Sequence, residues 1–109
     1  MPDEDDLYAR FLPPFVALAR ARVATALAAV QQRDHGATTT TVRELHSLAG
    51  EAGLLGLHAV IPLARDSEQK AKRLHVSHAD ADADALVAAL RELNTVIEGI
   101  GATISSPGG

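Results

Sequence analysis

The chain has 109 residues, of which 47% are hydrophobic and 22% are charged, and its formal net charge is −4 at pH 7. This length suits one domain with one core, and the apolar content is too high for a disordered chain. The lack of cysteine excludes disulfides and thiolate chemistry, and an acidic chain with only three aromatic residues and no basic stripe disfavours nucleic acid as a partner.

The N-terminus is acidic at residues 3–6, where a secretory signal would be basic and then apolar. The longest apolar run, residues 23–30, is broken by Thr25 and is far shorter than a membrane span. We therefore expect a cytoplasmic protein that does not associate with membranes. Its many alanines and arginines suggest a bacterial source with GC-rich codons.

The first half of the chain contains three helical patterns. Residues 5–12 predict a short helix that ends before Pro13 and Pro14, and residues 15–32 have the apolar spacing of a long amphipathic helix. Residues 33–37 break this pattern. A further helix starts within residues 38–41, where Thr41 and Glu44 have the spacing of a capping box, and ends near residues 53–56.

The second half predicts two more helices. Residues 57 to about 74 are helical by composition, and the helix should begin near His58 or Ala59, because Pro62 must lie in its first turn or kink it. After a loop at residues 75–78, an Asp-rich stretch precedes the clearest periodicity in the chain. Its apolar residues follow each other at alternating spacings of 4 and 3: Leu86, Leu90, Leu93, Ile97, Ile100 and Ile104.

These elements predict an all-α fold, an antiparallel up-down four-helix bundle with a short extra N-terminal helix. We expect the bundle to span residues 1–104 and residues 105–109 to form a flexible tail. The periodic last helix could serve a homodimer, but a four-helix monomer needs it for its own core, so a monomer is expected. The starting methionine and the full set of helices suit a free-standing protein.

His46 is placed unusually within the predicted third helix. At about 100° per residue, it lies roughly 100° from the centre of that helix's apolar side, with Arg43 one turn before it and Gly50 and Gly53 after it. Two helical glycines cost on the order of 2 kcal/mol relative to alanine. A structural explanation is close helix packing at Gly50 and helix termination at Gly53 and Gly56, with His46 as an ordinary surface residue. The other explanation is functional: the glycines leave the imidazole of His46 accessible to a partner.

The residues around His46 resemble the signature of the histidine-containing phosphotransfer (HPt) domain. In that family a histidine is followed by leucine, commonly a basic residue, then glycine, small residues and a second glycine. The matching positions here are His46, Leu48, Gly50, Ala52, Leu55 and Gly56. The family is a four-helix bundle with the histidine on its second bundle helix. The order and lengths of the helices predicted over residues 5–103 resemble this arrangement.

The resemblance implies a phosphocarrier, not an enzyme, in a two-component phosphorelay. His46 would take a phosphoryl group from a sensor histidine kinase or a receiver-domain aspartate and pass it to the receiver domain of a response regulator. A neutral imidazole is nucleophilic at physiological pH, and phosphoryl transfer needs access and charge neutralisation. No cofactor is expected on this chain, because the receiver would supply the Mg²⁺. The partners, the direction of flow and the process controlled do not follow from the sequence.

One position departs from the family pattern, because Ala49 stands where a basic residue is common. Arg43 could take over its role, and Lys70, Lys72 or Arg65 of the following helix could approach His46. We expect Arg43, Gly50, Gly53 and Lys70 to give the partner or the phosphate access to His46. The departure also leaves open an HPt-like adaptor that binds receiver or kinase domains without phosphotransfer.

Other histidines and carboxylates of the chain are weaker candidates for site residues. His75, His78 and Asp80 have a spacing that could ligate a transition metal, but three ligands in a loop are a weak signal, so no metal site is expected. Glu44 and Glu51 lie on other faces of the helix than His46. The spacing therefore places no carboxylate against the imidazole, and a hydrolytic triad has no support.

Overall fold

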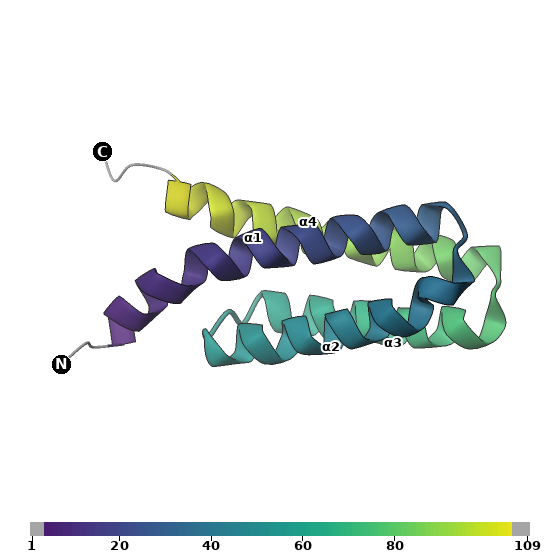
Figure 1. The fold of residues 1–109 in the computed structure, drawn as a ribbon, viewed down its shortest axis with the longest axis horizontal. Coiled ribbons are helices and arrows are strands. Elements are labelled where there is room, and N and C mark those ends of the chain that lie inside the picture. The colour runs from purple at the N-terminus through teal and green to yellow at the C-terminus, as the bar shows by residue number, and fades with distance from the viewer. Residues whose placement is uncertain (1–3, 106–109) are drawn as a thin grey trace.

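A computed structural model describes residues 4–105 of the chain (Figure 1). Its elements are α1 (Glu4–Gln31), the 3₁₀ turn η1 (His35–Ala37), α2 (Thr38–Leu54), α3 (Val60–Ser77) and α4 (Asp80–Ser105). The short connections make successive helices antiparallel. The predicted all-α bundle is therefore confirmed for the described residues, which contain no strand.

The core is organised around α4, which packs against both α1 and α3, while α2 packs mainly against α3. The periodic residues of α4 point into this core: Leu86, Leu90, Leu93 and Ile97 are fully buried and Ile100 is partly buried. Ile104 is 36% exposed, because it lies beyond the packed part of the bundle. The apolar side of α4 is thus covered by helices of its own chain, and the monomeric state stays a prediction.

The prediction of a separate N-terminal helix was wrong, because α1 runs without interruption from Glu4 to Gln31 through Pro13 and Pro14. Two prolines remove two backbone donors and bend a helix, and the first part of α1 is directed away from the bundle in Figure 1. The chain stays helical because Leu12 and Phe15, on either side of the prolines, are both buried in the core.

The two ends of the bundle contain different connections and chain ends. The described ends of α1 and α4 lie at the same end as the turn between α2 and α3 (Figure 1). At this end Gly101 brings α4 close to α1, since a Cβ added there would lie 3.1 Å from Cγ1 of Val16. The α1–α2 and α3–α4 connections lie together at the opposite end.

By length and composition alone, the stretch Tyr8–Gln31 of α1 is apolar enough to cross a membrane. Core helices of bundles pass the same test. In this structure Ala19 and Val23 of the stretch are fully buried against other helices of the chain. We therefore interpret α1 as a core helix, and the absence of membrane association stays a prediction.

The start of α2 differs from the predicted capping box. The helix begins at Thr38, and Ala37 precedes it without a side-chain cap. Thr41 is buried and Glu44 is instead paired with Arg22 of α1, at 2.7 Å between Oε2 and Nε. The helix thus begins at the first residue of the predicted range, and Thr41 and Glu44 do not form a capping box.

The turn between α2 and α3 follows the expected pattern. Gly56 adopts a left-handed conformation with φ of 68°, which glycine tolerates without a steric cost. α3 begins at Val60, so Pro62 lies in its first turn, where its missing N–H has no consequence. The helix continues to Ser77 and therefore includes His75. The loop before α4 consists of His78 and Ala79 and is shorter than the predicted loop at residues 75–78.

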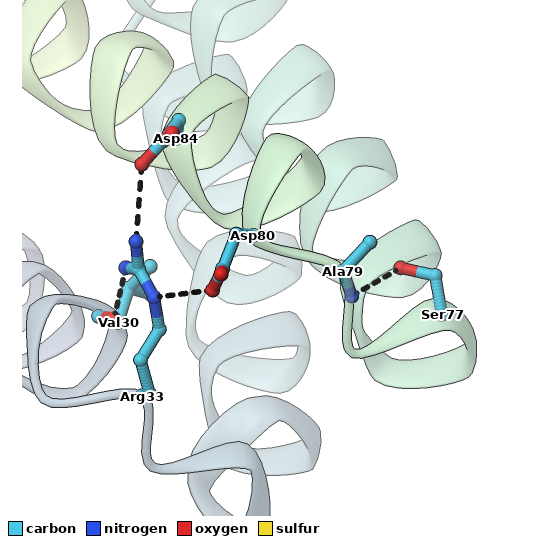
Figure 2. Close-up of polar contacts among 6 residues, drawn as sticks. All are labelled: Val30, Arg33, Ser77, Ala79, Asp80 and Asp84. Carbon is cyan, nitrogen blue, oxygen red and sulfur yellow. Dashed lines mark hydrogen bonds and ion pairs between the residues drawn. The ribbon is translucent and has the colours of Figure 1, made fainter.

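Arg33 ties the α1–α2 connection to the start of α4 (Figure 2). Its Nη1 donates to the carbonyl oxygen of Val30 at 2.9 Å, and its Nε and Nη2 donate to Asp80 and Asp84, each at 3.1 Å. The same figure shows the hydroxyl of Ser77 accepting a hydrogen bond from the amide of Ala79. Arg33 makes these contacts from a left-handed backbone, with φ of 56°.

The predicted boundary at residue 104 is close to the end of α4 at Ser105. The rest of the predicted tail, residues 106–109, lies outside the described residues.

Replacing Leu90 with alanine tests the core. Leu90 is fully buried, so Leu90→Ala should lower the free energy of unfolding by about 2–5 kcal/mol through lost apolar burial and a cavity. Urea titration followed by circular dichroism measures this change. Val76→Ala is the control, because Val76 is 85% exposed and should change stability by less than about 0.5 kcal/mol. Equal effects of both variants would contradict the described core.

Two substitutions of Arg33 separate its backbone strain from its ion pairs. The pairs are exposed and each is worth about 0–1 kcal/mol, whereas alanine with a positive φ costs about 1 kcal/mol more than glycine. Arg33→Ala should therefore unfold at lower urea concentration than Arg33→Gly. If the alanine variant is the more stable one, the left-handed conformation of this residue is wrong.

Candidate functional site

His46 projects from the outer side of α2. The apolar residues of this helix, Leu45, Leu48, Ala49 and Ala52, are buried in the core. Their spacing fixes the rotation of α2 and turns the intervening His46 outward. The side chain of His46 is 79% exposed, so its imidazole is open to a partner in the way the sequence predicted.

Two glycines follow His46 on the same face of α2. A Cβ added at Gly50 or at Gly53 would meet no atom within 4 Å outside the local helix backbone, and both residues are exposed. Close helix packing therefore does not explain Gly50. The left-handed Gly56, two residues after the end of α2, terminates the helix, so neither Gly50 nor Gly53 is required by backbone conformation or packing.

A carboxylate lies against the imidazole, and sequence reasoning missed it. Glu68 of α3 places both of its carboxylate oxygens 3.3 Å from Nδ1 of His46. Glu68 is buried, with 9% of its side chain exposed. Because a carboxylate accepts a hydrogen bond, this contact favours the tautomer with its proton on Nδ1 and the lone pair on Nε2. No spacing within α2 could show this pair, since it depends on how α2 and α3 pack.

Lys72 belongs to the same group of side chains. Its Nζ lies 3.2 Å from Oε2 of Glu68, one turn earlier on α3. That oxygen is also the one 3.3 Å from Nδ1 of His46. The three side chains therefore form one chain of contacts, with the buried carboxylate of Glu68 between the imidazole of His46 and the ammonium of Lys72.

The other predicted cations lie apart from this group. Lys70 is engaged by Asp66, with its Nζ 2.7 Å from both carboxylate oxygens. Arg43 is exposed on α2 one turn before His46, and it makes no ion pair with the described residues. The structure thus places Arg43 on the predicted face and Lys70 on the neighbouring helix, and neither contacts His46.

An open apolar groove lies beyond Gly53, at the end of the bundle that holds the α2–α3 turn. α1 contributes five lining residues and the end of α2 and its turn contribute the rest: Tyr8, Phe11, Pro14, Phe15, Leu18, Glu51, Gly53, Leu54, Leu55 and Gly56. Phe11 is 50% exposed and Leu54 is 89% exposed. Sequence reasoning missed this groove, because it predicted that α1 would be broken at its prolines.

Three other histidines, His35, His75 and His78, lie at the opposite end of the bundle, whereas His58 lies in the α2–α3 turn. Nδ1 of His75 lies 2.6 Å from Oγ1 of Thr38. The rings of His35 and His78 are stacked, with centroids 4.4 Å apart and planes 2° from parallel. No group of three or more potential ligands that could hold a metal ion is found among the described residues, so the weak metal signal of residues 75–80 gains no support.

The chain was compared with protein-family models, curated proteins and solved structures. No curated protein and no solved structure matches it. The family model of the Hpt domain matches residues 11–99, a range that begins near the N-terminal part of α1 and ends in α4. Together with the helical bundle and the exposed histidine on α2, this match over most of the chain shows that the protein belongs to the Hpt domain family, the phosphocarriers of histidine phosphotransfer in phosphorelays.

Proposed function

We propose that the protein carries a phosphoryl group on His46, taking it from a kinase or a receiver-domain aspartate and giving it to another receiver domain. The contact between Nδ1 of His46 and the buried carboxylate of Glu68 carries this proposal. It directs the other ring nitrogen, Nε2, away from the helix pair. A nucleophile whose tautomer is favoured by a carboxylate and whose side chain is exposed meets the main demand of phosphoryl transfer, which is positioning.

The transfer step balances without a further reagent. The lone pair of Nε2 attacks the phosphorus atom, and the P–O bond to the donor aspartate breaks. The aspartate leaves as a carboxylate with the bonding electrons. The proton on Nδ1 stays in place, and the positive charge that forms on the ring faces the carboxylate of Glu68. The receiver would supply the aspartate and the Mg²⁺, so this chain needs no metal of its own.

Access to His46 comes from the surface beside it. Gly50 and Gly53 leave the backbone of α2 bare on the face of His46. Gly53 also lines the apolar groove between α1 and the α2–α3 turn. The histidine face and the groove are therefore continuous along α2, which supports one receiver domain covering both, with its apolar residues in the groove.

The alternative is an adaptor that binds receiver or kinase domains without phosphotransfer. The observation that favours it is Ala49, which is 7% exposed and leaves α2 without a cation directly after His46. The two functions share the docking surface and differ only in whether His46 becomes phosphorylated. Labelling of the protein therefore distinguishes them.

His46→Gln tests the assignment of the nucleophile. Incubated with a phosphorylated receiver domain, the wild-type protein should acquire acid-labile, base-stable phosphate, and His46→Gln should acquire none because glutamine has no nucleophilic ring nitrogen. His58→Gln is the control, since His58 is also exposed and should leave labelling unchanged. Label that survives His46→Gln would rule out His46, and an unlabelled wild type with every receiver tested would favour the adaptor.

Substitutions of Gly50 test access. Because an added Cβ meets nothing there, Gly50→Ala should raise the free energy of unfolding by about 1 kcal/mol. Gly50→Leu should keep the helical circular dichroism spectrum and slow transfer from a receiver at least about tenfold, since a branched side chain one turn from His46 would obstruct the incoming phosphoryl group. Normal transfer by a folded Gly50→Leu protein would show that Gly50 does not provide access.

A further inference from the structure

Phosphorylation of His46 would place negative charge next to a buried carboxylate, and this charge requires a cation nearby. A phosphoryl group brings about two negative charges at neutral pH. It would arrive beside Glu68, whose carboxylate is buried and lies 3.3 Å from the imidazole. Residues 47–50, the turn that follows His46 on α2, carry no charge. The compensating cation must therefore come from elsewhere.

Lys72 is the cation that the structure links to the imidazole. Its Nζ and Nδ1 of His46 contact the same oxygen of Glu68, at 3.2 and 3.3 Å, so the ammonium is at most two contact lengths from the ring. The side chain of Lys72 is 50% exposed. Its ammonium is therefore held close to the site and keeps the freedom to turn toward a group bound at Nε2.

Other cations on the neighbouring helices are engaged or not linked to the ring. Lys70 is paired with Asp66, and Arg22 is shared between Glu44 and Glu51. Arg43 is exposed on α2, but no contact connects it to His46 or Glu68. Arg43 and Arg65, which is exposed on α3, are thus the main rivals, and glutamine variants of both belong in the test.

We propose that Lys72 is a catalytic residue of this chain, whose ammonium contacts the phosphoryl oxygens on Nε2 of His46 and offsets their charge. Glu68 holds Lys72 in reach before the phosphoryl group arrives. The proposal rests on the proposed function of His46. In this role Lys72 contributes charge and a hydrogen bond and gives no proton to the reaction.

Phosphoramidate is the donor that tests this role without any receiver docking. With this reagent the Nε2–P bond forms as the donor's P–N bond breaks and ammonia leaves. The rate of His46 labelling should fall at least about tenfold in Lys72→Gln, a factor that corresponds to about 1.4 kcal/mol. Lys72→Arg should restore most of the rate, since arginine keeps the charge and the donors.

Arg73→Gln is the matched control, because it removes the same charge from the adjacent exposed residue of α3. It should label within about twofold of the wild type. Arg43→Gln and Arg65→Gln should each have a smaller effect than Lys72→Gln. A normal rate in Lys72→Gln, an equal loss in Arg73→Gln, or a larger loss in Arg43→Gln or Arg65→Gln would each overturn the proposal.

A double variant separates contact with the phosphoryl group from simple neutralisation of Glu68. Glu68→Gln keeps an oxygen that can accept the hydrogen bond from Nδ1. If Lys72 contacts the phosphoryl group, adding Lys72→Gln to Glu68→Gln should still slow labelling, although by less than in the wild-type background because the charge of Glu68 no longer holds Lys72. Equal rates for Glu68→Gln and the double variant would show that Lys72 only offsets Glu68, which contradicts the proposal.

The failure of this proposal differs from the failure of the proposed function. A wild-type protein that labels on His46 with phosphoramidate and with a receiver, together with an unaffected Lys72→Gln variant, rejects Lys72 alone. A wild type that labels with neither donor rejects the phosphocarrier itself. Circular dichroism and urea unfolding of every variant exclude loss of the fold as the cause.

Discussion

The packing of α2 against α3 is the constraint on which the rest of the site depends. Leu45, Leu48 and Ala52 of α2 are buried by it, and their helical period leaves His46 on the outside. The same packing brings Glu68 of α3 under the exposed imidazole. One apolar interface between two helices therefore sets which side chain is accessible, which of its nitrogens is held, and which charge lies beneath it.

Glu68 stands out because a buried carboxylate is costly unless it is paired. Its two oxygens face His46 on one helix and Lys72 on its own helix. The imidazole of His46 remains exposed all the same, so the site is only half enclosed. In the proposed function the protein contributes a supported nucleophile on an open face, and the partner contributes most of the catalytic groups, in keeping with a family of phosphocarriers.

Periodicity within one helix was predictable from the sequence, and contacts between helices were not. The 4–3 spacing on α4 correctly indicated its buried side, and the spacing on α2 correctly placed His46 outside. Glu68 escaped notice because its distance from His46 depends on the relative rotation of two helices. The prediction that the helix ends before the prolines of α1 was wrong for a related reason. The burial of the residues on both sides of the prolines outweighs the tendency of proline to end a helix.

The arrangement of the chain ends has a practical consequence. The described ends of α1 and α4 lie at the same end of the bundle as the α2–α3 turn (Figure 1), and Tyr8 near the start of α1 lines the apolar groove at this end. A module joined ahead of α1 would extend from the helix that lines this groove and would compete with a binding partner for space. Fluorophores or surface tethers are better attached at the far end, near the stacked rings of His35 and His78.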